Sequence, residues 1–204
     1  MNNLNTNNLN YKFAITIFVS IIYIFSYTFS QFLALNPTLP GMTGFELSIP
    51  FIPWTIIPYL SFYIYFVFGL CFLDMDLFHK SHLASFLGTF FSVIIFNIYP
   101  TSLPPRTMIL ESGGLLDSLF LFLYSVDATT NCFPSLHVSV TITISYYLLK
   151  QIKSYNSKLS AAVIIWAIMI CLSTLTTKQH YLVDVIGGSF VSLFSILIVK
   201  RIFH

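Results

Sequence analysis

Three ionisable side chains lie within seven residues of an otherwise strongly apolar chain. Lys178, His180 and Asp184 occupy this stretch, whereas only 8% of all residues are charged. His180 and Asp184 are four positions apart, so they share one face if they begin a helix. The carboxylate can then accept a hydrogen bond from one imidazole nitrogen, which fixes the tautomer and leaves the other nitrogen free to attack. With Lys178 beside it to neutralise an approaching phosphate, His180 is predicted to be a nucleophile.

Two further polar motifs supply groups that suit phosphoryl transfer. The first is N-C-F-P-S-L-H, in which Ser135 and His137 follow Pro134, a residue favoured in the first turn of a helix. The unsatisfied amides of that turn and the serine hydroxyl could hold phosphate oxygens, while a protonated His137 could protonate a leaving oxygen. The second is P-T-S-L-P-P-R, which ends at Arg106 and offers a bidentate clamp on the same oxygens.

Each of these signals has a plainer interpretation when it stands alone. A histidine and an aspartate four residues apart often only support a helix, Ser135 could only cap a helix, and Arg106 could anchor a lipid head group. Two histidines and an aspartate could also bind zinc. Arg106 and Lys178 would repel a divalent cation, however, so no metal site is predicted. The convergence of these side chains in three motifs favours a site for a phosphoryl group.

The composition is that of a membrane protein. Hydrophobic residues make up 56% of the chain, including 22 Phe, and the net charge of only +2 gives no basic patch that would indicate nucleic-acid binding. We predict a single all-α polytopic membrane domain over residues 1–204, with residues 1–11 disordered. Six membrane-spanning helices are expected, at about residues 13–35, 54–73, 83–99, 135–149, 159–176 and 181–199. A shorter apolar run, 118–126, predicts an interfacial helix between the third and fourth spans.

Positive charges are distributed unevenly over the expected spans. Most lysines and arginines fall at the end that carries both termini, namely Lys12, Lys80, Lys150, Lys153, Lys158, Lys200 and Arg201. Only Arg106 and Lys178 fall at the other end. This bias predicts cytoplasmic termini and three polar motifs on a periplasmic, extracellular or lumenal face.

Two of the motifs resemble those of a known family. P-S-L-H-V-S at residues 134–139 and H-Y-L-V-D at residues 180–184 are similar to the second and third signature motifs of the type-2 phosphatidic acid phosphatase superfamily. The resemblance implies that His180 attacks phosphorus and becomes phosphohistidine, that Asp184 orients it, and that His137 is the general acid on the leaving group. Phosphate binding is implied for three residues: Arg106, Ser135 and Lys178. The family requires no metal ion or other cofactor.

The chain departs from the family pattern in its first and third motifs. Tyr99 stands where the first motif has a lysine, and Thr107 follows the arginine in place of a proline. In the third motif, Ser173 and Thr174 replace a serine–arginine pair, so one phosphate-binding arginine is missing. Lys178 is expected to supply the lost charge. The form T-K-x-H-Y-x-x-D is similar to that of the branch with inositol phosphorylceramide synthases and related head-group transferases.

The resemblance leaves three functions open. Water as the acceptor implies an integral-membrane lipid phosphatase acting on a phosphomonoester or pyrophosphate, whereas a lipid or polyol hydroxyl implies a phosphotransferase similar to inositol phosphorylceramide or sphingomyelin synthases. The third is a non-catalytic lipid-binding or transport protein. We favour the phosphatase, because the chain is short and offers no obvious second head-group site. The Phe-rich spans predict an acyl or polyprenyl substrate in the bilayer, and the run 118–126 could form a lid.

Overall fold

All regular structure in the described part of the chain is helical. A computed structural model describes residues 6–40, 43–104, 114–152 and 156–203. These residues form α1 (Thr6–Leu33), α2 (Gly44–Ser48), the 3₁₀ turn η1 (Pro53–Thr55), α3 (Ile56–Phe72), α4 (Met75–Ile98), α5 (Leu115–Val126), α6 (Leu136–Ile152), α7 (Ser157–Thr176) and α8 (Leu182–Ile202). The all-α fold expected from the sequence is confirmed.

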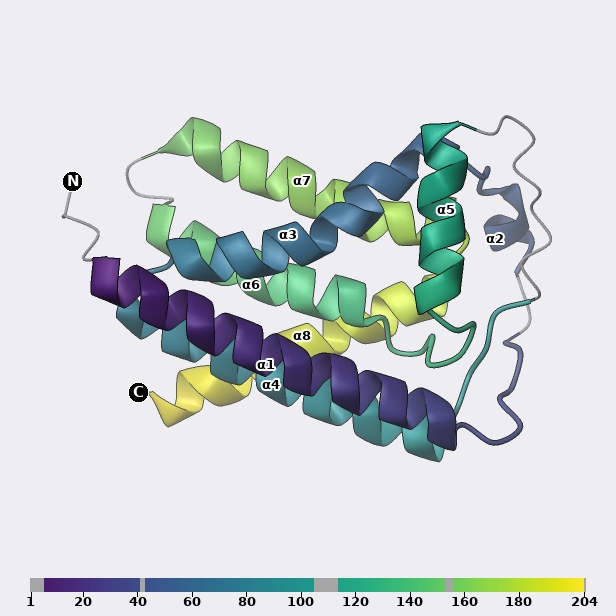
Figure 1. Cartoon of the computed structure of the whole chain (residues 1–204), viewed down its shortest axis with the longest axis horizontal. Coiled ribbons are helices and arrows are strands. Elements are labelled where there is room, and N and C mark those ends of the chain that lie inside the picture. Colours follow the sequence, from purple (N-terminus) through teal and green to yellow (C-terminus); the bar gives the residue numbers. More distant parts are fainter. Residues whose placement is uncertain (1–5, 41–42, 105–113, 153–155, 204) are drawn as a thin grey trace.

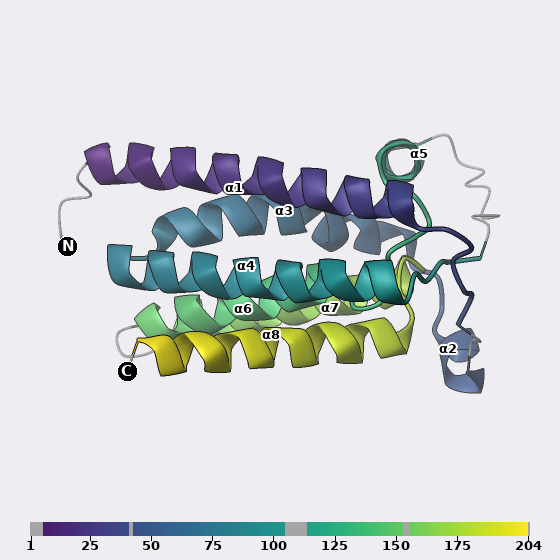
Figure 2. The ribbon, with the colours of Figure 1, turned by 90° about the horizontal axis from the view of Figure 1, so that it is seen from below.

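The long helices of the described chain lie side by side in one bundle, and α6 occupies its centre. α6 packs against α3, α4, α7 and α8, whereas α1 packs on the outside against α3 and α4. Figures 1 and 2 show both termini at one end of the bundle, with α2 and α5 at the opposite end. The connection before α6, which carries N-C-F-P-S-L-H, and the connection before α8, which carries Lys178 and His180, lie at that opposite end (Figure 1).

The described chain fits an integral multi-pass membrane protein. Five of its helical segments are long and apolar enough to cross a membrane: Asn8–Leu33, Pro53–Phe72, Met75–Ile98, Ser157–Thr176 and Leu182–Ile202. The predicted fourth span corresponds to α6, which is not among them and has 17 residues. Its Ser139, Thr141, Thr143 and Ser145 are all buried. Because four helices surround α6, these hydroxyls face protein rather than lipid, and a sixth span stays a prediction.

Helices α1 and α4 begin earlier than predicted. Residues 6–11, expected to be disordered, belong to α1, whose Lys12 is buried and donates to a backbone carbonyl at the end of α3. α4 begins at Met75, because Asp74 accepts a hydrogen bond from the amide of Leu77 and so caps the helix. The polar residues that follow Asp74 are therefore the first turns of α4 rather than a connection between helices.

Helix α5 lies across the end of the bundle, whereas the long helices run along it. Figure 1 shows α5 upright beside the end of α3, and Figure 2 shows it almost end-on. Phe120 and Leu123 are buried on its inner face, where Phe120 contacts Phe51 with ring centroids 5.3 Å apart. Leu121 and Phe122 are exposed on its outer face. An amphipathic helix in this orientation suits a membrane interface, and the location of α5 in a bilayer stays a prediction.

The described basic residues gather at the end of the bundle that carries the termini. Six of them lie in the first or last two turns of their helices there: Lys12, Lys80, Lys150, Lys158, Lys200 and Arg201. Lys178 lies at the opposite end, whereas Arg106 and Lys153 fall outside the described residues. The termini and the polar motifs are therefore at opposite ends of the bundle, and which side of a membrane each faces stays a prediction.

Candidate active site

The connection between α7 and α8 is a tight turn that places a histidine just before α8. α7 ends at Thr176, and Lys178 adopts a left-handed backbone with a φ of 58°. The amides of Gln179 and His180 both donate to the carbonyl of Thr174, at 3.0 Å each. These bonds hold the turn, because a left-handed conformation is unfavourable for a residue other than glycine unless its surroundings enforce it.

Asp184 ties this turn to α8 and holds the imidazole of His180. Its Oδ2 accepts from the amide of Tyr181, 2.8 Å away, and thereby caps the first turn of α8. The same oxygen lies 3.2 Å from Nδ1 of His180, which is also 3.1 Å from the carbonyl oxygen of Cys132. A carbonyl oxygen can only accept, so Nδ1 carries the proton. Nε2 of His180 therefore keeps its lone pair.

His137 lies in the first turn of α6 among aromatic rings of α3. Tyr59 stacks on it, with ring centroids 4.3 Å apart and planes 22° apart, and Phe62 lies at 4.4 Å. The His180 ring is 6.2 Å away, so the structure brings the two histidines together. Nε2 of His137 is buried and has no hydrogen-bond partner among the described residues. Because an unpaired buried polar atom is costly, this nitrogen marks a place where a polar ligand group or a water can bind.

Ser135 caps α6 and joins it to α8. Its Oγ accepts from the amide of Val138 at 3.4 Å, and its own amide donates to the carbonyl of Asp184 at 3.0 Å. Gly188 permits this close approach, because a Cβ there would lie 2.4 Å from the carbonyl oxygen of Ser135. The plainer role considered for Ser135, a helix cap, is therefore present. Phosphate binding by its hydroxyl, which is fully buried, stays a prediction.

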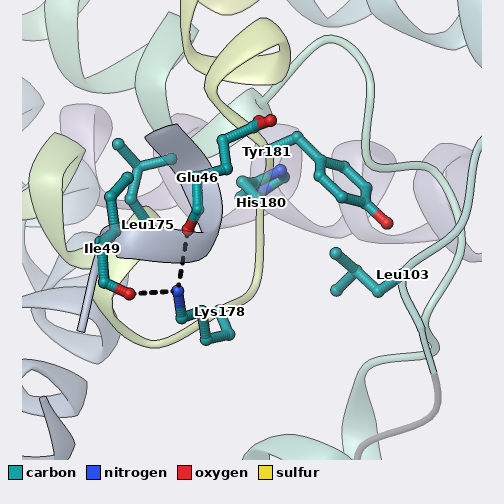
Figure 3. A pocket seen from close by; sticks show the side chains of 7 residues that line it. All are labelled: Glu46, Ile49, Leu103, Leu175, Lys178, His180 and Tyr181. Atoms are coloured by element: carbon teal, nitrogen blue, oxygen red, sulfur yellow. Dashed lines mark hydrogen bonds between the residues drawn. The ribbon is translucent and has the colours of Figure 1, made fainter. Parts of the chain in front are cut away.

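Lys178 and His180 line one pocket together with the α2 segment. The pocket is small and is lined by Glu46, Ile49, Leu103, Leu175, Lys178, His180 and Tyr181 (Figure 3). Nζ of Lys178 donates to the backbone carbonyls of Glu46 and Ile49. Burial lowers the pKa of the Lys178 ammonium below its usual value, and the charge of Glu46 opposes this shift.

Glu46 is a residue of this pocket that the sequence analysis missed. In α2 its Oε2 accepts from both the amide and the hydroxyl of Thr43, at 2.7 Å each. Its Oε1 accepts from the amide of Leu182, the first residue of α8, at 2.7 Å. Burial raises the pKa of the Glu46 carboxyl, but hydrogen bonds from Thr43 and Leu182 outweigh it, so the pKa lies below its usual value. The Thr-x-x-Glu spacing signals a helix start, but nothing local signals contact with α8.

Five other residues were singled out from the family pattern. Arg106 and Thr107 fall outside the described residues, so a phosphate clamp by Arg106 stays a prediction. Tyr99 is the exposed C-cap of α4. Ser173 and Thr174 are buried near the end of α7, where their hydroxyls donate to backbone carbonyls. Within the described ranges, no group of three His, Cys, Asp or Glu side chains is placed to hold a metal ion.

Comparison with protein families gives one match for this chain. The model of the PAP2 superfamily, the type-2 phosphatidic acid phosphatases, matches residues 53–198, which is more than half of the chain. The chain belongs to the PAP2 superfamily. The match takes in η1, α3 to α7, most of α8 and both histidine motifs. Comparison with curated proteins gives no match.

Membership in the PAP2 superfamily supports phosphatase-like chemistry. Such chemistry needs a nucleophile held by a third group, and His180 with Asp184 has that form. α1 and α2 lie before the matched residues, so Glu46 comes from a part of the chain outside the match. The pocket therefore combines residues that the family model covers with residues that it does not.

Proposed function

We propose that this protein is an integral-membrane lipid phosphatase that cleaves a phosphomonoester or pyrophosphate of a lipid through a phosphohistidine intermediate. The observation that carries the proposal is the imidazole of His180, whose Nδ1–H has two acceptors and whose Nε2 keeps its lone pair. A ring held in this way is already in the tautomer that attacks. Membership in the PAP2 superfamily supports phosphatase-like chemistry.

In the first step, Nε2 of His180 attacks phosphorus, and the bond between phosphorus and the lipid-side oxygen breaks. The electron pair of that bond goes to the leaving oxygen, which takes a proton from protonated His137. Positive charge develops on the His180 ring and is stabilised by the Asp184 carboxylate and the Cys132 carbonyl. The products of this step are the phosphohistidine and a lipid alcohol, or a lipid monophosphate when the substrate is a pyrophosphate.

In the second step, a water molecule attacks phosphorus and gives a proton to His137, which is now neutral. The bond between Nε2 of His180 and phosphorus breaks, and its electron pair returns to the nitrogen. Inorganic phosphate leaves, and both histidines are back in their starting states. The unpartnered Nε2 of His137 supports this double role, because it has no competing hydrogen bond among the described residues.

The phosphate oxygens need donors that meet their negative charge. Lys178 lines the same pocket as His180 and uses its ammonium on two backbone carbonyls, which leaves one of its three N–H groups for an oxygen of the substrate. We assign further contacts to the Ser135 hydroxyl and to Arg106. The acyl or polyprenyl chain of the substrate would lie in the bilayer against the exposed apolar faces of the bundle.

We assign the active site to the non-cytoplasmic face of the membrane. The support for this orientation is the gathering of basic residues at the end of the bundle that carries the termini, opposite to the histidine pair. Cytoplasmic loops are enriched in lysine and arginine, so that end is expected to face the cytoplasm.

Phosphate release by the purified protein tests this function. The assay uses phosphatidate, phosphatidylglycerol phosphate and a polyprenyl diphosphate, each with and without a chelator. The wild-type protein is expected to release inorganic phosphate from at least one of them regardless of chelator, and His180→Ala to lose at least about three orders of magnitude in rate. His79→Ala is the matched control, because His79 is an exposed histidine of α4 outside the site, and its rate is expected to be unchanged.

Quenching the reaction with labelled substrate tests the intermediate. A phosphohistidine is expected to appear as an acid-labile label in the wild-type protein and to be missing in His180→Ala. An acid-stable label, or none at all, would contradict it. Head-group exchange without release of inorganic phosphate would instead assign the transferase, and an unchanged lipid-binding or transport activity in His180→Ala would assign the non-catalytic role.

A further inference from the structure

The α2 segment, residues 43–49, contacts the α7–α8 turn on both sides of His180. Two residues before this histidine, Nζ of Lys178 donates to the carbonyl oxygen of Glu46 at 3.3 Å. Two residues after it, the amide of Leu182 donates to the carboxylate of Glu46 at 2.7 Å. Glu46 therefore holds the turn through both its main chain and its side chain. Figure 3 shows the hydrogen bond between its carbonyl oxygen and Nζ of Lys178.

Glu46 is itself held firmly enough to act as a support. It is only 8% exposed, and its second carboxylate oxygen takes two hydrogen bonds from Thr43. Three donors therefore converge on one carboxylate, and hydrogen bonds to an ionised acceptor are stronger than those between neutral groups. The side chain has little freedom to move away from α8.

Glu46 and Asp184 share the amides at the start of α8. Asp184 accepts from the amide of Tyr181, and Glu46 accepts from the next amide, that of Leu182. The first amides of a helix have no partner within the helix and attract any acceptor nearby. Without Glu46, the amide of Leu182 would attract Oδ1 of Asp184, which has no partner among the described residues, and draw that carboxylate out of its present position. The contact of 3.2 Å between Asp184 and Nδ1 of His180 would then weaken.

We propose that Glu46 is a positioning residue for the phosphoryl-transfer site, a role that rests on the proposed function of His180. It fixes His180 through the start of α8 and fixes Lys178 through the backbone carbonyls of α2, and it touches neither phosphorus nor the leaving group. α2 lies outside the matched residues 53–198, so the family match does not account for this support. It holds the lysine that stands near the place of the missing arginine.

Three substitutions of carboxylates separate this role from a purely structural tie. Glu46→Ala removes the acceptor, and it is expected to lower kcat by about 10- to 100-fold, because a displacement of about 1 Å at a reacting group can cost about 10²-fold in rate. Glu46→Gln keeps an oxygen for the amide of Leu182, although its NH₂ group then faces the amide of Thr43. Its kcat is therefore expected to fall less than that of Glu46→Ala, by no more than about fivefold. Asp76→Asn is the control, because Asp76 is exposed and pairs with Lys80 in α4.

Two measurements accompany kcat and KM: the rate of phosphohistidine labelling and the melting temperature in detergent. Glu46→Ala is expected to slow labelling at a temperature where it is fully folded, and Glu46→Gln to restore the labelling rate. If Glu46→Ala does not fold, Glu46→Asp keeps the charge but draws the carboxylate back by one methylene, and the same loss of kcat is expected.

The outcomes are distinguishable. A wild-type kcat in Glu46→Ala overturns the positioning role, as does an equal loss of kcat and melting temperature in the alanine and glutamine variants. If the wild-type protein itself forms no label and releases no phosphate from any lipid phosphate, the proposed function fails, and the role of Glu46 falls with it.

Discussion

The two imidazole rings of the site lie 6.2 Å apart, but their surroundings differ in kind. His180 is held by polar acceptors, because Nδ1 faces both a carboxylate oxygen of Asp184 and the carbonyl of Cys132. His137 is held by the faces of aromatic rings from α3, and its Nε2 has no partner among the described residues. Hydrogen bonds fix the tautomer of the first ring, whereas packing fixes only the orientation of the second.

This difference suits two different tasks. A nucleophile must present one nitrogen with a lone pair throughout, so a fixed tautomer favours it. A group that gives a proton in one step and takes one in the next must hold either protonation state without breaking a hydrogen bond. Stacking against Tyr59 orients such a ring without a hydrogen bond to its Nε2 from the described residues. Three substitutions test whether the two environments have these different roles.

Asp184→Asn is expected to have the largest effect, a fall of about 10³-fold in kcat for lipid phosphates. The asparagine amide can turn its NH₂ group toward the His180 ring, which favours the tautomer protonated on Nε2 and removes the attacking lone pair. Because the same oxygen of Asp184 faces both the His180 ring and the amide of Tyr181, this turn of the amide also removes the cap of α8, so the melting temperature is expected to fall as well. A fall of less than tenfold would show that the Cys132 carbonyl alone sets the tautomer.

His137→Gln is expected to lower kcat by about 10²-fold when the leaving group is a lipid alcohol. An aryl phosphate, whose leaving phenolate needs no proton, should show a loss of less than about tenfold in the same variant. His180→Ala should be inactive on both substrates, so the pair of substrates separates the two histidines. Equal losses of His137→Gln on both would contradict a role as general acid.

Gly188→Ala is expected to have the smallest effect on chemistry and to act first on stability. The added Cβ would lie 2.4 Å from the carbonyl oxygen of Ser135, so α6 and α8 must separate slightly near the histidine pair. Overpacking of this kind costs about 1–3 kcal/mol, measurable as a lower free energy of unfolding in detergent. Gly44→Ala is the control, because a Cβ there meets no atom within 4 Å. A Gly188→Ala variant as stable as the wild type would show that α6 and α8 move apart without a cost in stability.

Some contacts of the site could be predicted from the sequence, and others could not. The contact between His180 and Asp184 follows from their spacing, and it is present. The proximity of His137 was expected from the convergence of motifs, but the aromatic rings around it were not. A fourth span was predicted over residues 135–149, but its central location was not, because a run of residues does not reveal how many neighbours a helix has. Glu46 was missed, because its capping box describes only α2.

The sequence by itself determined the features that depend on neighbouring residues or on composition. These are the helical membrane class and the pairing of His180 with Asp184, four residues further on. Only the tertiary structure decided what surrounds each imidazole: the Cys132 carbonyl at His180, the α3 rings at His137, and Glu46 on the start of α8. Each of these contacts joins residues that are far apart along the chain. Such contacts arise from how separate helices pack, and helix periodicity carries no information about that packing.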